Sequence, residues 1–106
     1  MVALFGERIR ELRKKKGMTL DQLAVATDSS KSYIWELENK DPPRPSADKI
    51  ARIATALDVT GDYLMGTADV DLQSAEDEAF FRKYSQMTPE ARARLRKLAK
   101  ALDEDD

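Results

Sequence analysis

The chain of 106 residues carries 18 Lys and Arg against 20 Asp and Glu, with no cysteine and no histidine. This length allows one domain, or one domain with an appendage, around a single modest core. The lack of cysteine excludes a disulfide framework and a thiolate metal site. Without histidine, catalysis or metal binding would rely on carboxylates alone, so we expect no enzyme, no cofactor and no bound metal.

No apolar run reaches membrane-spanning length and nothing resembles a signal peptide, so we expect a cytoplasmic protein with no membrane contact. A net charge of −2 by itself disfavours nucleic acid as a partner. The charge is uneven, however: residues 1–66 hold 11 Lys and Arg against 10 Asp and Glu, whereas residues 67–106 hold 7 against 10. The acidic excess therefore belongs to the C-terminal part.

The first expected helix covers residues 5–16, where Phe, Ile and Leu recur at helical spacing before Gly17 supplies a stop. A second helix is expected after Thr19, because Gln22 stands at the capping-box spacing. Residues 27–30, Thr-Asp-Ser-Ser, then offer turn chemistry and another N-cap.

A third helix follows this turn, ends near Asn39 and buries Ile34 and Leu37. Two short helices joined by a tight turn have the form of a DNA-reading helix-turn-helix element, whose second helix fits a major groove. Three prolines in the following loop exclude a helix there. Ser46 and Thr60 then cap two further helices, which complete the core of a domain over residues 1–66.

Residues 67–73 are small, polar and acidic, which is typical of a linker. Beyond them, residues 74–106 predict a helical hairpin, with one helix starting at Ser74 and the other at Thr88 and Pro89. The seam of the second helix is too short for a stable coiled coil alone, so we expect dimerisation or partner binding. The alternative is a hairpin folded back on its own domain. The residues expected to form this surface are Phe80, Phe81, Tyr84, Leu95, Leu98 and Leu102.

Over roughly residues 4–66 the chain resembles the XRE-type regulators, which include the phage Cro and repressor DNA-binding domains. The segments that carry the resemblance are LRKKKGMT, the pattern LAxxxxxSxxxIxxLEN, RPSADKIARIATALDV and DYLMG, in this order. The resemblance implies an all-α fold, namely a five-helix lambda-repressor-like DNA-binding domain. Here it would carry an appended C-terminal helical hairpin.

In this family the first two residues of the third helix, and those one and two past its buried Ile, read bases. The resemblance therefore assigns base contacts to Lys31, Ser32, Trp35 and Glu36, with Tyr33 at the edge of the same face. Donor, acceptor and apolar groups in this set suit guanine, cytosine and the thymine methyl. The alternative is an ordinary solvated helix face.

Trp35 has a structural alternative of its own, in which its ring covers one of the prolines of the following loop. Phosphate contacts are implied for Thr19, Leu20, Asn39, Lys40 and Arg44. Leu20 departs from the glutamine common in relatives, so its backbone amide would make the contact. Arg13 and Glu38 match a family ion pair that joins the first and third helices as scaffold.

The sequence thus predicts a sequence-specific transcription regulator bound to double-stranded operator DNA. The expected form is a homodimeric repressor of a palindromic operator, with its own promoter as one candidate target. The alternative is an antitoxin or a protease-controlled regulator whose C-terminal helices bind a protein partner.

Overall fold

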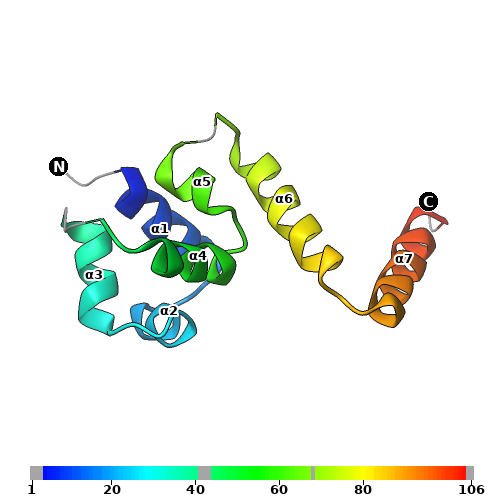
Figure 1. Cartoon of the computed structure of the whole chain (residues 1–106), viewed down its shortest axis with the longest axis horizontal. Coiled ribbons are helices and arrows are strands. Elements are labelled where there is room, and N and C mark those ends of the chain that lie inside the picture. Colours follow the sequence, from blue (N-terminus) through cyan, green and yellow to red (C-terminus); the bar gives the residue numbers. More distant parts are fainter. Residues whose placement is uncertain (1–3, 41–43, 68, 105–106) are drawn as a thin grey trace.

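The computed structural model describes residues 4–40, 44–67 and 69–104, and these residues form helices without any strand. Figure 1 shows α1 to α5 gathered into a globular part from which α6 and α7 lead away. The elements are α1 (Leu4–Lys15), α2 (Leu20–Ala26), α3 (Lys31–Asn39), α4 (Ala47–Ala56), α5 (Gly61–Met65), α6 (Leu72–Ser85) and α7 (Pro89–Glu104). The predicted all-α fold is confirmed.

One apolar core lies among α1 to α5, at the positions where helical spacing predicted an inward face. Its buried side chains are Ile9, Leu12, Leu23, Ala24, Ile34, Leu37, Ile53, Ala54, Leu57, Val59 and Leu64. Burying a large aliphatic side chain contributes about 1.5–3 kcal/mol. The core therefore stabilises the packing of the two helices of the helix-turn-helix element.

The helix starts follow the predicted N-caps. A side-chain oxygen accepts a hydrogen bond from the amide three residues on at Thr19, Ser30, Ser46 and Thr60. At Thr19, Gln22 Oε1 also accepts from the Thr19 amide at 2.8 Å, which completes the capping box. The cap at Ser30 fixes the start of α3 directly before Lys31.

α6 begins at Leu72, two residues before the start predicted at Ser74. The N-cap is Asp71, whose Oδ1 accepts from the Ser74 amide at 2.8 Å. The prediction was wrong here because the acids after Ser74 also suit a first helical turn. One turn into the helix, Ala75 is fully buried in the core, with Leu72 packed beside it. The start of α6 is thus part of the globular unit.

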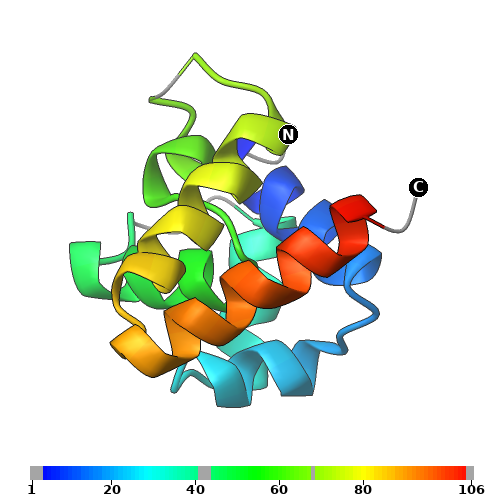
Figure 2. The ribbon, with the colours of Figure 1, turned by 90° about the vertical axis from the view of Figure 1, so that its right-hand side faces the viewer.

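The rest of the hairpin is open. Phe80 and Phe81 are exposed, and α7 has no buried residue over the part that the structure describes. Figure 2 shows α6 and α7 diverging from their junction, and Arg96 Nη1 donates to the Tyr84 hydroxyl near it. A hairpin folded back on its own domain therefore describes the start of α6, but not α7.

Ion pairs connect α6 with α1 and with the turn after α4. Lys15 Nζ lies 3.8 Å from a Glu76 carboxylate oxygen, and Lys83 Nζ lies 3.9 Å from an oxygen of Asp58. Lys16 pairs with Asp58 as well. Exposed pairs of this kind contribute about 0–1 kcal/mol each. The Lys15–Glu76 pair shows that the C-terminal end of α1 faces α6.

Candidate nucleic-acid interface

α3 buries one face and exposes the other. Ile34 and Leu37 belong to the core, and Ser30 caps the helix. The four residues predicted as the main base readers are all exposed, namely Lys31, Ser32, Trp35 and Glu36. The structure therefore brings them together on one solvent-facing surface of the second helix of the helix-turn-helix element.

Within this surface, Lys31 pairs with Asp21 of α2. Lys31 Nζ lies 3.8 Å from Asp21 Oδ2, and both side chains are exposed. Such a pair is weak, so Lys31 can exchange it for an acceptor on a base edge. Asp21 places a negative charge beside Lys31, which penalises close approach of a phosphate.

Trp35 is 44% exposed and forms the centre of a small group at the end of α3. Lys40 Nζ lies 5.9 Å from the Trp35 ring centroid, within cation–π range. Asn39 Nδ2 donates to the Trp35 carbonyl at 2.9 Å. Two predicted phosphate contacts are thus adjacent to a predicted base reader. Of the prolines that this ring would cover in its alternative structural role, Pro42 and Pro43 lie outside the described residues.

Tyr33 differs from its neighbours on α3. Its ring is half-buried and packs against the core. Burial raises the pKa of the Tyr33 hydroxyl, because the phenolate would lose solvation. Tyr33 therefore presents a neutral hydroxyl at the margin of the exposed face.

At the N-terminus of α2, backbone groups rather than side chains are available for the predicted phosphate contacts. The Thr19 amide is occupied by Gln22, and the Leu20 side chain is half-buried against the core. Helix geometry leaves the Leu20 amide without an intrahelical acceptor, and a helix start attracts anions. Any phosphate contact by Leu20 would therefore use its amide.

Arg44, another predicted phosphate contact, lies beside a cavity rather than beside Trp35. Together with residues of α4, α5 and α6, it lines a cavity of about 710 Å³. Lys40, from the other end of the same connection, lies instead at Trp35. Arg44 and Lys40 therefore lie beside different features, the cavity and the Trp35 ring.

Arg13 of α1 and Glu38 of α3 form the ion pair that the sequence predicted as scaffold. Arg13 Nε donates to one carboxylate oxygen at 2.7 Å, and Nη2 donates to the other at 2.9 Å. The hydrogen bond to Glu38 raises the pKa of Arg13. Glu38 directly precedes Asn39, so this pair helps to fix the end of α3.

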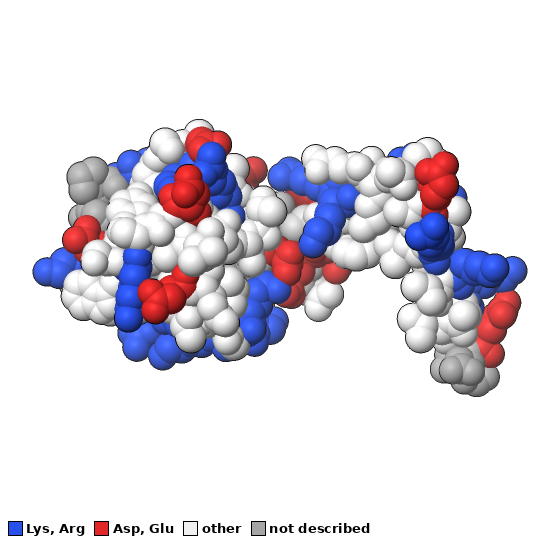
Figure 3. All heavy atoms as spheres, turned by 90° about the horizontal axis from the view of Figure 1, so that it is seen from below, with Lys and Arg blue, Asp and Glu red and all other residues white. Residues whose placement is uncertain are grey.

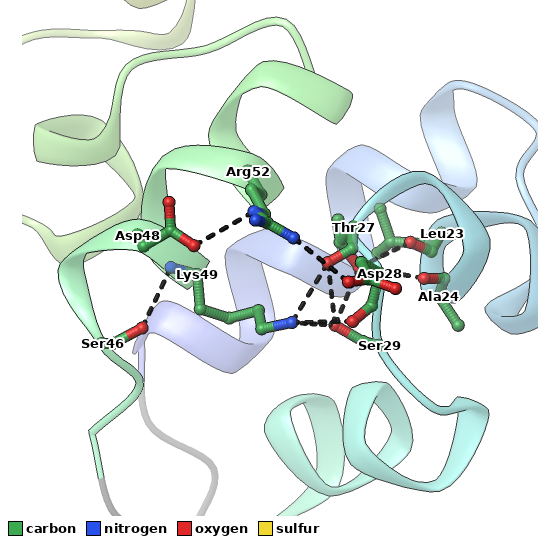
Figure 4. Close-up of polar contacts among 9 residues, drawn as sticks. All are labelled: Leu23, Ala24, Thr27, Asp28, Ser29, Ser46, Asp48, Lys49 and Arg52. Atoms are coloured by element: carbon green, nitrogen blue, oxygen red, sulfur yellow. Dashed lines mark hydrogen bonds and ion pairs between the residues drawn. The ribbon is translucent and has the colours of Figure 1, made fainter.

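Sequence reasoning did not find the residues that hold the turn between α2 and α3 (Figure 4). Lys49 Nζ donates to the Thr27 carbonyl at 3.1 Å, the Asp28 carbonyl at 3.0 Å and Ser29 Oγ at 2.8 Å. Arg52 Nη1 also donates to Asp28 Oδ2 at 3.4 Å. Both basic residues come from α4. No motif marks a helical lysine as the partner of a distant turn.

On the face drawn in Figure 3, basic and acidic groups are interspersed over the globular part, and uncharged areas extend toward α6 and α7. Interspersed charge gives weak non-specific attraction to DNA, so contacts to particular bases matter more. Among the residues that the structure describes, no group of three or more acidic, His or Cys side chains could hold a metal ion. None of the helices described here is long and apolar enough to cross a membrane.

A family model described as a helix-turn-helix domain matches residues 4–64, which include α1 to α5 except its last residue. The chain belongs to this helix-turn-helix domain family. The predicted XRE-type resemblance is confirmed, and the relatives of this helix-turn-helix chain are regulators rather than enzymes.

One such relative is YobD of Bacillus subtilis, an uncharacterized HTH-type transcriptional regulator. It is 37% identical over 68 residues, which cover 62% of this chain and 58% of YobD. The chain thus spans little more than half of that relative.

Two solved structures of another family member, SinR, match as well. SinR in complex with DNA, called the master regulator for biofilm formation, gives a TM-score of 0.54 at 33% identity. The match covers 57% of this chain and 97% of that chain. A SinR–SinI complex gives a TM-score of 0.56 at 24% identity, over 94% of this chain and 98% of that chain. The second likeness concerns the fold alone, and the two together confirm the lambda-repressor-like fold with appended C-terminal helices.

Proposed function

We propose that this protein is a sequence-specific DNA-binding transcription regulator, acting in the cytoplasm as a dimeric repressor of a palindromic operator. The observation that carries the proposal is the exposed face of α3, where Lys31, Ser32, Trp35 and Glu36 stand together beside a capped helix start. Membership of the helix-turn-helix family supports it. So does the relative SinR, which was solved in complex with DNA.

The chemistry of this face suits the edges of bases in a major groove. Lys31 can donate to guanine O6 or N7, and Glu36 can accept from cytosine N4. Ser32 can donate or accept, and Trp35 can pack on a thymine methyl. Tyr33 is assigned a contact at the margin, because its ring is half-buried.

Phosphate contacts would fix the register of α3 on the duplex without reading sequence. We assign them to Thr19, the Leu20 amide, Asn39, Lys40 and Arg44. Asn39 and Lys40 have the strongest structural support, because both adjoin Trp35. Arg44 has the weakest, since it borders the cavity beside α4.

In this proposal residues 1–66 read DNA, residues 67–73 link the two parts, and residues 74–106 assemble the dimer. α6 itself begins at Leu72, inside the proposed linker. A two-fold dimer would place two copies of α3 about 34 Å apart, one helical turn of DNA. Exposed apolar side chains on α6 and α7 support this assembly, with Phe81 65% exposed and Leu102 73% exposed.

The test is binding to a labelled duplex from the protein's own upstream region, and to duplexes enriched from a random pool, each against scrambled DNA at two salt concentrations. Lys31→Ala and Ser32→Ala should each lose about 1–3 kcal/mol on the preferred duplex. Lys83→Ala, which removes a positive charge from α6, should lose little binding free energy on the same duplex. A wild-type protein that prefers no duplex would refute the proposal.

The unburied α7 favours a second candidate function, in which the C-terminal helices bind a different protein. The protein would then be an antitoxin or a protease-controlled regulator. Purification of the full chain from its native host distinguishes the two. A stoichiometric second protein lost on Leu98→Asp supports the alternative, whereas a homodimer lost on the same change supports the dimeric repressor.

A further inference from the structure

The turn between α2 and α3 contains a residue in the left-handed backbone conformation, which Asp adopts more readily than most residues but which glycine adopts at lower cost in free energy. Asp28 has φ +54°, in the left-handed region that glycine adopts without strain. Its conformation allows the Ser29 amide to donate to the Ala24 carbonyl at 2.8 Å, which closes the end of α2. Ser30 follows at once as the cap of α3. The direction of α3 therefore depends on Asp28 keeping its left-handed backbone conformation.

Lys49 holds this turn through hydrogen bonds from its ammonium group. An ammonium group has three N–H donors, and those of Lys49 meet acceptors on three successive turn residues, Thr27, Asp28 and Ser29. Two of these acceptors are carbonyls at the end of α2, where a positive charge also suits the helix dipole. Lys49 is half-buried and extends from α4, which belongs to the rigid core (Figure 4).

We propose that Lys49 is a positioning residue for base recognition: it holds the turn at Asp28 and thereby fixes the direction in which Lys31 and Ser32 are presented. The inference deepens the proposed DNA-binding function and depends on it. Arg52 assists through Asp28 Oδ2 and is itself held by Asp48 at 3.1 Å. Lys49 acts on α3 through the turn and needs no contact of its own with DNA.

The first experiment compares Lys49→Met with Lys83→Met, which removes the same charge from α6. Binding to the preferred duplex and to scrambled DNA is measured at two salt concentrations, at a temperature where circular dichroism shows each variant folded. Lys49→Met should weaken preferred-duplex binding about tenfold and scrambled binding much less. Lys83→Met should leave the ratio unchanged.

Two results of this experiment would overturn the inference. Equal loss on both duplexes, with a salt slope reduced by about one, would identify Lys49 as an ordinary phosphate contact and overturn the inference. An unchanged ratio would overturn it too. If wild-type protein prefers no duplex, the proposed function itself fails.

A rescue variant separates positioning from general stabilisation. Asp28→Gly removes the backbone strain, so the turn no longer needs the ammonium group. The double variant Lys49→Met with Asp28→Gly should regain most of the lost preference. A double variant as unselective as Lys49→Met alone would contradict the inference.

Amide hydrogen exchange tests the same point without DNA. Lys49→Met should speed exchange at Ser29, whose amide bonds to Ala24, while the core amides of α4 keep their protection. Adding Asp28→Gly should restore protection at Ser29. Unchanged exchange at Ser29 in Lys49→Met would show that the turn does not depend on this lysine.

Discussion

Arg13 and Glu38 join α1 to the end of α3 through two parallel hydrogen bonds of 2.7 and 2.9 Å, with the Glu38 side chain only 1% exposed. Arg13 Nη1 also donates to the Met18 carbonyl at 2.9 Å, in the turn before α2. One guanidinium group therefore connects the entry to α2 with the exit from α3. Such a fork fits a carboxylate better than an ammonium group could.

Replacing Arg13 with Met should destabilise the protein by about 3 kcal/mol, because a buried carboxylate would lose its partner. Urea denaturation measures this change. Arg82→Met is the matched control, since Arg82 pairs with Glu78 on exposed α6; its loss should stay below about 1 kcal/mol. Equal effects of the two variants would contradict a scaffold role for Arg13.

Glu36 should limit binding to wrong sequences. A carboxylate on the exposed face of α3 repels phosphates wherever it finds no cytosine N4 to accept from. Glu36→Gln should therefore strengthen binding to scrambled DNA and reduce the preference for the operator. The expected change in preference is roughly tenfold, toward the lower end of the range for one base contact.

The matched control is Glu78→Gln, which removes the same charge from α6. Fluorescence anisotropy at two salt concentrations reports both affinities. If Glu78→Gln strengthens scrambled binding as much as Glu36→Gln does, net charge alone explains the effect.

The exposed face of α3 was predictable because local patterns determine it. The cap at Ser30 gives its start, and the spacing of Ile34 and Leu37 gives its inner side, so the outward residues follow. Lys49 was not predictable, because its role depends on how α4 crosses the end of α2. Spacing within one helix carries no information about that crossing.

In the C-terminal part, too, the helices were predictable from local patterns and their packing was not. Helix-forming patterns in α6 and α7 were visible, whereas the burial of Ala75 was not, since a small residue gives no strong apolar signal. The aromatic residues expected to be buried in an interface, such as Phe80 and Phe81, are exposed in the single chain. Sequence located the elements but could not give their packing partners.

Asp71 should make the start of α6 sensitive to acid. The hydrogen bond from the Ser74 amide lowers the pKa of Asp71 below its ordinary value. A group with a lowered folded-state pKa contributes stability fully above its unfolded pKa, and loses that contribution as pH falls through the folded pKa. We expect the cap to weaken below about pH 4.

Carboxyl NMR titration should give a lower midpoint for Asp71 in the native protein than in urea. Asp71→Ala should speed amide exchange in the first turn of α6 at neutral pH, whereas Asp77→Ala, also on exposed α6, should not. A native midpoint equal to that in urea would show that the cap does not stabilise the anion.

The hairpin should be the dimer interface. Leu98 and Leu102 are 63% and 73% exposed, on a helix with no buried residue among those described. Placing a charge in a shared apolar seam leaves it desolvated without a partner, which costs several kcal/mol. Leu98→Asp should therefore weaken self-association by at least about a hundredfold, because a cost of about 2.8 kcal/mol corresponds to that factor.

Sedimentation velocity at several concentrations measures the change. Val25→Asp, at an 82% exposed apolar position on α2, is the control and should leave self-association intact. Because a two-fold dimer binds a palindrome through both halves, Leu98→Asp should also weaken operator binding while circular dichroism stays unchanged. A Leu98→Asp protein that remains dimeric would contradict a seam on α7, whereas a chain truncated after Gly66 that still dimerises would place the interface on α1 to α5.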